Sequence, residues 1–185
     1  MVSNVTTLGL GYIGLPTSAL IATHGISVHG VDISQKVVDI INAGKIHIVE
    51  PELDQAVAKA VASGCLKADI KPAIADTYLI VVPTPFKGNF EPDISYIESA
   101  TESILPLLKE GDLYIIESTS PVGTTERMRQ FIYSRRPELK GKLHIAYCPE
   151  RVLPGNVMYE LVHNDRVIGG IDQASTQKAV AFYQQ

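Results

Sequence analysis

Short runs rich in Val and Ile alternate with longer amphipathic stretches along the whole chain, and this alternation constrains the fold more than any other feature. Such β-α repeats build a parallel sheet, and nearly uninterrupted apolar runs are typical of strands that are covered on both faces. We predict strands at residues 5–8, 27–31, 78–82, 113–117, 143–147 and 166–169.

The stretches between these runs predict helices. Ser34 is a plausible N-cap, Gly44 and Gly64 are natural stops, and Gly123 precedes a helix start. The predicted helices are residues 13–24, 34–43, 51–63, 94–108, 124–134 and 174–183. The expected fold is α/β, a doubly wound and mostly parallel sheet with helices on both faces, and the 185 residues form one domain.

Composition excludes several classes of function. Net charge is -4 and the basic residues form no stripe, which argues against nucleic acid. Glycines and Pro16 interrupt the apolar segment 5–22, and a basic flank is missing, so neither export nor a membrane span is indicated. Neither the five histidines nor Cys65 and Cys148 have metal-ligand spacing, so we expect no metal, and a reducing cytoplasm fits.

A glycine motif follows the first predicted strand and opens the first helix. In it Gly9 permits a tight turn, Gly11 lets the backbone approach a pyrophosphate, and Gly14 allows close helix-strand packing. The N–H groups of Tyr12 and Ile13 would then point at the phosphates. In this strand-turn-helix context the motif predicts a Rossmann-type dinucleotide site.

An acidic residue ends the second predicted strand, 21 positions after Gly11. The carboxylate of Asp32 can accept hydrogen bonds from the adenosine ribose hydroxyls and would repel a 2'-phosphate. We therefore expect NAD rather than NADP. The alternative is that Asp32 only caps the helix that begins near Ser34.

Polar residues follow three later strands at the edge where ligands bind in open α/β sheets. Thr84 lies between two prolines and could place its hydroxyl beside the cofactor. The alternative is that this segment is only a structural turn. Residues 117–125 are dense in hydroxyls, some of which must cap a helix while at least one is free for a ligand. Glu150 and Arg151 stand side by side in a proline-stiffened loop, with a surface ion pair as the alternative. Cys148 is interpreted as a small buried hydrophobe.

Together these segments resemble the UDP-glucose/UDP-mannuronate dehydrogenases, the nucleotide-sugar 6-dehydrogenase family. The resemblance covers almost the whole chain, through residues 9–16, 31–33, 82–85, 117–123, 148–151 and 164–170. Residues 50–53, 83–88 and 149–155 look most like the members that oxidise UDP-N-acetyl-D-mannosamine. Enzymes acting on UDP-glucose usually carry Pro-Glu-Phe-Leu-x-Glu-Gly in the last segment, so Arg151 and Pro154 argue against glucose.

The resemblance implies an NAD-dependent, four-electron oxidation of the C6 alcohol of a UDP-sugar to a carboxylate, for surface polysaccharide such as enterobacterial common antigen. Two NAD act in succession, and a cysteine carries the aldehyde and thioester stages before hydrolysis. The resemblance also assigns roles. Tyr12, Ile13 and Asp32 hold the adenosine diphosphate half, and Thr84 and Thr125 lie along the cofactor. Thr119 and Glu150 orient the catalytic water, and Arg151 and Val152 contact the sugar nucleotide.

The family's nucleophilic cysteine lies in a Gly-x-Cys-x-Pro segment, which this sequence lacks. We therefore expect residues 1–185 to be the N-terminal NAD-binding domain of a longer enzyme, inactive alone, without the central helix and the C-terminal UDP-binding domain. The full-length enzyme is then a homodimer or larger through that helix. The same domain of a UDP-GlcNAc or UDP-glucose dehydrogenase, and a non-catalytic nucleotide-binding regulatory module, remain alternatives.

Overall fold

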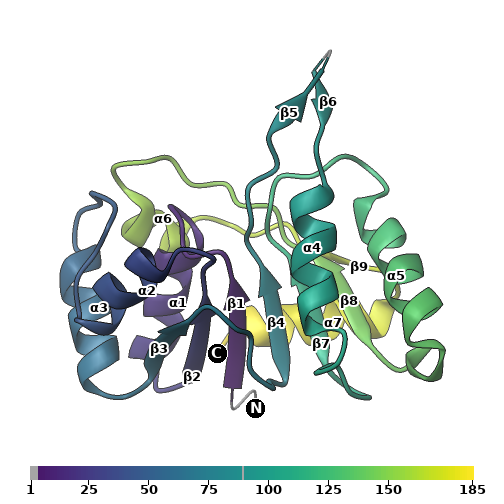
Figure 1. The fold of residues 1–185 in the computed structure, drawn as a ribbon, viewed down its shortest axis with the longest axis horizontal. Helices are drawn as coiled ribbons and strands as arrows, with labels where there is room; N and C mark the ends of the chain where they lie inside the picture. The colour runs from purple at the N-terminus through teal and green to yellow at the C-terminus, as the bar shows by residue number, and fades with distance from the viewer. Residues whose placement is uncertain (1–3, 89) are drawn as a thin grey trace.

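The computed structural model describes residues 4–88 and 90–185. Its main sheet has seven strands in the order β3-β2-β1-β4-β7-β8-β9, and all neighbours are parallel except β8 and β9 (Figure 1). The strands are β1 Asn4–Leu8, β2 Ser27–Val31, β3 Leu66–Asp69, β4 Thr77–Ile80, β7 Leu113–Ile116, β8 His144–Tyr147 and β9 Gly169–Gly170. A separate antiparallel hairpin joins β5 Phe86–Lys87 to β6 Glu91–Pro92.

Strand order creates the functional edge. From β1 the chain moves to β2 and β3 on one side, and it then returns to β4 on the other side of β1. The loops that leave β1 and β4 therefore diverge at their carboxyl ends, and such a switch point forms a crevice in open α/β sheets. The hairpin projects beyond the domain from the same edge (Figure 1).

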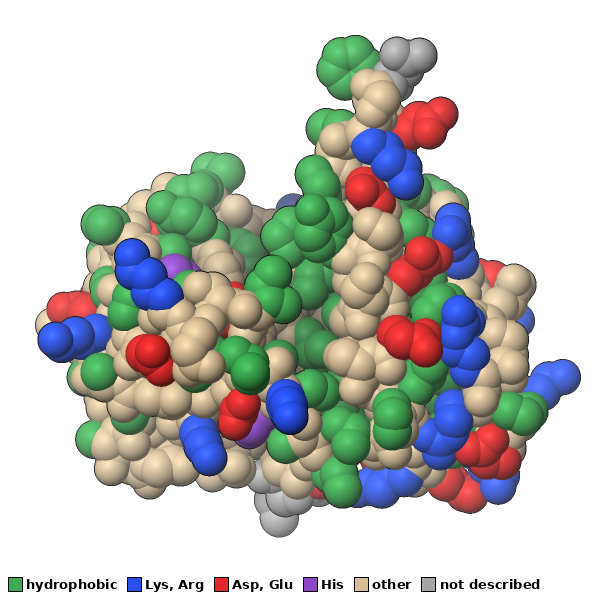
Figure 2. Space-filling view, viewed as in Figure 1, with side chains coloured by type: hydrophobic (Ala, Val, Ile, Leu, Met, Phe, Trp, Pro, Cys, Tyr) green, Lys and Arg blue, Asp and Glu red, His purple; other side chains and the backbone are tan. Residues whose placement is uncertain are grey.

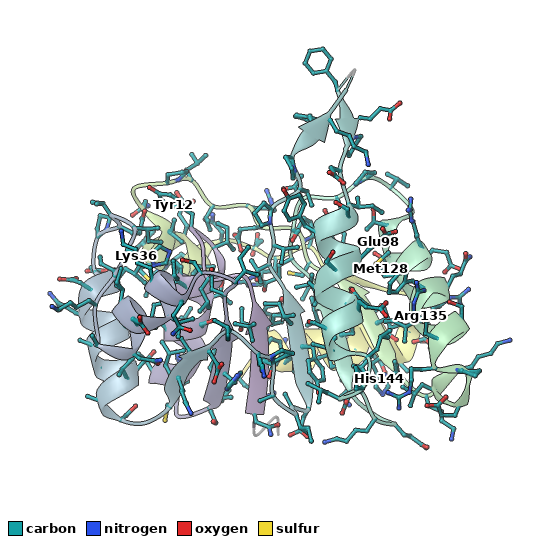
Figure 3. The ribbon with its side chains drawn as sticks, in the orientation of Figure 1. Tyr12, Lys36, Glu98, Met128, Arg135 and His144 are labelled. Atoms are coloured by element: carbon teal, nitrogen blue, oxygen red, sulfur yellow. The ribbon has the colours of Figure 1, made fainter. Side chains whose placement is uncertain are left out.

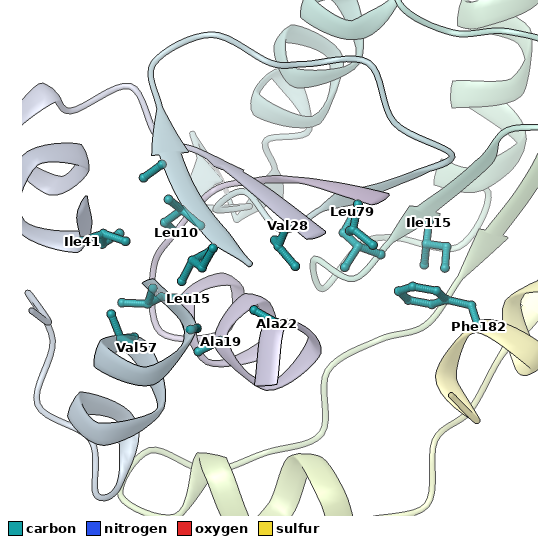
Figure 4. Packing of buried hydrophobic residues seen from close by; sticks show 14 of the residues in the cluster. Leu10, Leu15, Ala19, Ala22, Val28, Ile41, Val57, Leu79, Ile115 and Phe182 are labelled. Atoms are coloured by element: carbon teal, nitrogen blue, oxygen red, sulfur yellow. The ribbon is translucent and has the colours of Figure 1, made fainter. Parts of the chain in front are cut away.

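Helices cover both faces of the sheet, and the central strands β1, β4 and β7 are buried on both sides. In β7, Leu113 and Ile115 pack into one buried cluster, whereas Tyr114 and Ile116 pack into another. The first cluster joins α1, α3 and α7 to the sheet, and Figure 4 shows part of it. The second joins α4 and α5. The helices are α1 Gly14–Thr23, α2 Gln35–Asn42, α3 Leu53–Ala62, α4 Ser95–Ile104, α5 Thr124–Arg135, α6 Val157–His163 and α7 Gln173–Tyr183, with a short 3-10 helix at Pro137–Leu139.

The predicted fold class is confirmed, and five predicted strands and all six predicted helices are present with ends shifted by a few residues. Gly44 and Gly64 follow their helices with φ of 69° and 75°, and Gly123 precedes α5 with φ of 91°. These left-handed conformations favour glycine. Ser34 occupies the N-cap of α2, where its N–H donates to the Asp32 carboxylate at 2.9 Å.

The predicted strand at 166–169 is wrong in extent. Pairing begins only at Gly169, which lies opposite Tyr147 in an antiparallel ladder. Arg166 instead turns its guanidinium toward Cys148, and Val167 is 57% exposed. The strand therefore begins three residues later than predicted, and the side chain of Arg166 belongs to the interior contacts of Cys148.

Sequence reasoning missed β3, α6 and the hairpin. In β3 the residues alternate between buried and outward-facing, which is the signal of an edge strand. In α6, Val157 and Leu161 are buried one turn apart, although the helix has only seven residues. The hairpin is short and its Phe86 is exposed, so no periodicity marked it. No helix in the described part of the chain is long and apolar enough to cross a membrane.

Candidate functional site

A pocket of about 350 Å³ opens at the carboxyl ends of β1, β4, β7 and β8. The space-filling view shows the surface hollowed at this edge, beside the base of the hairpin (Figure 2). The pocket is lined by Gly9, Leu10, Gly11, Tyr12, Ile13, Asp32, Val81, Val82, Pro83, Thr84, Glu117, Ser118, Thr119 and Glu150. Eight residues predicted from the sequence are therefore brought together here.

The three glycines of the loop meet different surroundings. A Cβ on Gly9 would overlap the Val81 carbonyl oxygen, and a Cβ on Gly14 would overlap the Gly9 carbonyl oxygen. By contrast, no described protein atom lies within 4 Å of a Cβ placed on Gly11. The folded chain itself thus requires the first and third glycines, whereas the second leaves space beside the pocket, as close approach of a pyrophosphate demands.

Backbone donors of the loop are available to an anion. Ile13 is the N-cap of α1, and no acceptor in the described part of the chain receives a hydrogen bond from the N–H of Tyr12 or Ile13. The first N–H groups of a helix need an outside acceptor, and the helix dipole favours a negative one. Tyr12 is 50% exposed and lies at the pocket edge, on the same side as Lys36 of α2 (Figure 3).

The Asp32 carboxylate joins the loop to the start of α2. It accepts from the Leu10 N–H at 3.2 Å and from the Ser34 N–H at 2.9 Å, through different oxygens. The N-cap of α2 is Ser34, without a side-chain cap hydrogen bond, so Asp32 fixes the turn before the helix rather than capping it, and it also lines the pocket. Each carboxylate oxygen can accept a second hydrogen bond, so both roles are compatible.

Hydroxyl groups connect the loops that follow β4 and β7. The Thr84 hydroxyl donates to the Thr119 carbonyl at 2.6 Å, and the Ser118 hydroxyl donates to the Val82 carbonyl at 2.6 Å. Thr124 donates to the Pro121 carbonyl at 2.8 Å, in the turn before α5. Thr119 is exposed at the pocket. These hydroxyls therefore stabilise turns by donating to carbonyl groups. The expected helix capping is wrong, because the N-cap of α5 is Gly123 and has no side-chain cap hydrogen bond, and Thr119 remains a ligand candidate.

Four predicted residues lie outside the pocket lining, and the first of them is Gly14 at the start of α1. Thr125 is in the first turn of α5, and Val152 is half-buried in the loop before α6. The Arg151 guanidinium donates to the Asp165 carbonyl at 3.3 Å, and its backbone N–H donates to the Glu150 carboxylate at 2.7 Å. The alternative, a surface ion pair of Glu150 with its neighbour Arg151, is not formed in the described part of the chain, and Glu150 instead faces Arg166 at 3.9 Å. The contacts of Thr125, Arg151 and Val152 with ligands stay predictions.

Glu117 is a site residue that sequence reasoning quoted without assigning a role. It is 1% exposed, and it accepts a hydrogen bond of 2.5 Å from the Tyr183 hydroxyl. Burial, above all, raises the pKa of Glu117 to about 7, although Tyr183 and Arg166 oppose the rise. The signal in the sequence was a lone acidic residue directly after an apolar strand.

Glu50 is a second missed residue. It is 4% exposed, and its two carboxylate oxygens accept from the N–H groups of Gly155 at 2.9 Å and Val157 at 2.7 Å. The loop that carries Glu150 is thereby attached to the segment between α2 and α3. These are charge-assisted hydrogen bonds to a buried acceptor, which are among the stronger ones.

Cysteines and histidines play no evident part in this pocket. Cys148 is fully buried, and burial raises the pKa of its thiol, with the charge of Glu117 as the next cause. His144 lies at the opposite end of the sheet (Figure 3). In residues 4–88 and 90–185 no group of three or more His, Cys, Asp or Glu side chains could hold a metal ion.

Residues 3–185 match the UDP-glucose/GDP-mannose dehydrogenase family, NAD binding domain. The chain belongs to this family. It is 54% identical to a UDP-N-acetyl-D-mannosamine dehydrogenase from Yersinia pestis, with 97% of this chain and 44% of that protein covered. It is 50% identical to an NDP-N-acetyl-D-galactosaminuronic acid dehydrogenase from Ralstonia nicotianae, covering 97% and 44%.

Among solved structures, the UDP-N-acetyl-mannosamine dehydrogenase of Staphylococcus aureus superposes with a TM-score of 0.90 at 39% identity. The match covers 98% of this chain and 45% of that one. The chain thus spans less than half the length of the dehydrogenases that it resembles. The part that it spans is the family's NAD-binding domain, so NAD is the expected cofactor of the pocket.

Substitution of the second glycine of this NAD-binding domain separates binding from folding. In Gly11→Ala the new methyl group meets no described protein atom, so we expect stability in urea to change by less than about 0.5 kcal/mol. NAD affinity, measured by calorimetry, falls at least about tenfold because the methyl group occupies the approach of the pyrophosphate. Gly14→Ala, which clashes inside the loop, is destabilised instead. Equal NAD affinity of Gly11→Ala and the parent chain would contradict this.

Glu117 makes stability depend on pH in a defined direction. A glutamate carboxyl has an ordinary pKa of 4.5, which applies to the unfolded chain, and burial raises the pKa to about 7 in the folded chain. Between these values only the folded state keeps the proton. The stabilisation, on the order of 3 kcal/mol at most, is present below about pH 4.5 and lost as pH rises through about 7. We expect urea unfolding between these pH values to show this loss in the parent chain and its absence in Glu117→Gln.

The comparison must use the difference between the two chains because other groups titrate as well. Burial lowers the pKa of His144, and this contributes a change of opposite sign. If the difference in unfolding free energy between the parent chain and Glu117→Gln did not change with pH, Glu117 would not be the titrating group.

Proposed function

We propose that this chain is the cofactor-binding part of an NAD-dependent enzyme that oxidises the C6 hydroxyl of UDP-N-acetyl-D-mannosamine to a carboxylate. One observation carries the proposal. The pocket at the switch point combines a glycine loop, Asp32, Thr119 and Glu150 in a chain that is 54% identical to an enzyme named for that substrate.

The residues present fit NAD. The open space beside Gly11 and the unpaired N–H groups of Tyr12 and Ile13 suit the pyrophosphate, and the Asp32 oxygens can accept from the ribose hydroxyls. Thr84 and Thr125 would lie along the remainder of the cofactor. When bound, NAD supplies the two-electron acceptor of each oxidation.

Glu150 and Thr119 are proposed to hold the catalytic water. Both line the pocket from neighbouring loops, and the Thr119 backbone carbonyl is fixed by Thr84 at 2.6 Å. A carboxylate within reach of a water can take its proton during hydrolysis, so Glu150 is the candidate general base and Thr119 a positioning residue. Arg151 and Val152 are proposed to contact the sugar nucleotide from the same loop.

We also propose that the enzyme has further parts, because this chain covers only 44% of the relative from Yersinia pestis. A second part of the protein would supply the nucleophile, most of the uridine site and a helix that pairs two subunits. A cytoplasmic location is proposed because NAD is a cytoplasmic cofactor and Cys65 and Cys148 are both free thiols.

Cofactor preference tests the first half of the proposal. In calorimetric titrations of the 185-residue chain we expect NAD to bind at least about tenfold more tightly than NADP, because Asp32 repels a 2'-phosphate. Asp32→Ala should reduce the ratio of NAD affinity to NADP affinity. Asp39→Ala, a substitution at an exposed site on α2, should leave this ratio unchanged. Tighter binding of NADP to the parent chain would rule out this role of Asp32.

Substrate preference tests the second half. The full-length protein that contains this chain should reduce NAD with UDP-N-acetyl-D-mannosamine and form two NADH per sugar. A nucleotide sugar of the N-acetyl-D-galactosamine series is the second candidate, because the chain is 50% identical to the NDP-N-acetyl-D-galactosaminuronic acid dehydrogenase of Ralstonia nicotianae. UDP-GlcNAc and UDP-glucose complete the assay. A protein that binds NAD and oxidises none of them would instead be a regulatory nucleotide-binding module.

A further inference from the structure

Behind the pocket lies a group of side chains that we call the buried polar cluster. Its members come from the ends of β7 and β8, the segment before β9 and the end of α7, which are distant in sequence. They are Glu117, Cys148, Glu150, Arg166 and Tyr183. Two of them, Glu117 and Glu150, also line the pocket.

Each carboxyl group of the cluster has one oxygen with a hydrogen bond and one without. Glu117 accepts from the Tyr183 hydroxyl at 2.5 Å, and Glu150 accepts from the Arg151 N–H at 2.7 Å. The Oε2 atoms of both groups are buried and have no hydrogen-bond partner in the described part of the chain. A buried acceptor without a donor is costly, so two of them in one cluster require an explanation.

The charges of the cluster do not balance if both carboxyl groups are ionised. Arg166 is its one cation, with Nη1 at 3.9 Å from Glu150 and at 3.9 Å from the Cys148 sulfur, and its guanidinium lies 4.5 Å from the centre of the Tyr183 ring. Two carboxylates and one guanidinium leave a net negative charge out of water, which is unfavourable. One bound proton would make the cluster neutral.

The other acidic members of the cluster, Cys148 and Tyr183, do not change this count of charges. Burial raises the pKa of both the Cys148 thiol and the Tyr183 hydroxyl, and the charge of Glu117 is the next cause for each, so both stay neutral. The extra proton therefore belongs to a carboxyl group. Glu117 is the more buried of the two, and the charge of Glu150 is among the causes that raise its pKa.

We propose that Glu117 and Glu150 share one proton at neutral pH, that it rests on Glu117, and that Glu117 thereby keeps Glu150 ionised beside the pocket. A proton on Oε2 of Glu117 changes an acceptor that lacks a donor into a donor, and Oε2 of Glu150 is an acceptor that lacks one. One proton on Glu117 thus removes one of the two unpaired acceptors and balances the charges of the cluster.

The inference deepens the proposed function, on which it rests for the catalytic part of Glu150. In that role an O–H bond of a water breaks and Glu150 gains the proton, while the water oxygen bonds to the acyl carbon and the carbonyl π pair moves to its oxygen. That pair then returns as the bond from the acyl carbon to the sulfur of the enzyme's cysteine breaks, and the thiolate leaves. Glu117 makes and breaks no bond to substrate, so it is a positioning residue. A purely structural ion pair between Arg166 and two permanent carboxylates is the competing explanation, and it predicts no titration near neutral pH.

Carboxyl titration tests the inference without any turnover. The 185-residue chain would be labelled with carbon-13 at its glutamate side-chain carboxyl carbons and followed by NMR from about pH 4 to about pH 9. We expect one carboxyl carbon with a midpoint of about 7. It should be absent in Glu117→Gln and move to lower pH in Glu150→Gln, because a facing negative charge has been removed. It should be unchanged in Glu52→Gln, a matched substitution at an exposed site.

Three results would overturn the inference: no glutamate titrating near neutral pH, a neutral titration that survives in Glu117→Gln, or an unchanged midpoint in Glu150→Gln. The last comparison does not depend on whether Glu117→Gln folds. NAD calorimetry on the same chains separates this inference from the proposed function. A chain that binds NAD but lacks the neutral titration loses only the inference, whereas one with the titration and no NAD binding loses only the proposed function.

Discussion

Close approach of the glycine loop to the strands beside it is the constraint on which the rest of this structure depends. The Gly9 N–H donates to the Val31 carbonyl and the Val81 N–H donates to the Leu8 carbonyl, both at 2.8 Å. The loop is therefore held between β2 and β4, where Gly9, with φ of 96°, and Gly14 have no room for a Cβ. Because the turn is so tight, α1 begins directly at the carboxyl edge of β1 and its first N–H groups face the pocket.

The parts of the fold that the sequence predicted are those with local signals. The first strand, the glycine loop and α1 follow one another within twenty residues, and turn chemistry, apolar runs and helix stops determine each. Asp32 could be found because its distance from the loop reflects one β-α-β unit. The hydrogen bond between Thr84 and Thr119 was not predicted. Both residues follow strands, however, so the sequence did predict that they lie at the ligand-binding edge of the sheet.

The parts that escaped prediction depend on contacts between distant residues. The Tyr183 hydroxyl meets Glu117 across 66 positions, and the Gly155 N–H meets Glu50 across 105. Hydrophobic periodicity does not predict such long-range contacts. In the sequence Glu117 and Glu50 look like any other glutamate. The same holds for Arg166, which contacts Cys148 across 18 positions and lies in a segment that pairs only from Gly169 onward.

Two buried glutamates fix the two sides of the loop that carries Glu150, and they do so in opposite ways. Both oxygens of Glu50 accept backbone N–H groups, so these bonds stabilise a carboxylate and attach the loop to the domain. Glu117 has a donor for one oxygen only, and Arg166, whose charge lowers its pKa, lies 3.9 Å from Glu150. A carboxyl with complete partners serves as an anchor, whereas one with incomplete partners is sensitive to protonation. Burial raises the pKa of Glu117 to about 7, whereas Glu50 attaches the loop to the domain through the N–H groups of Gly155 and Val157.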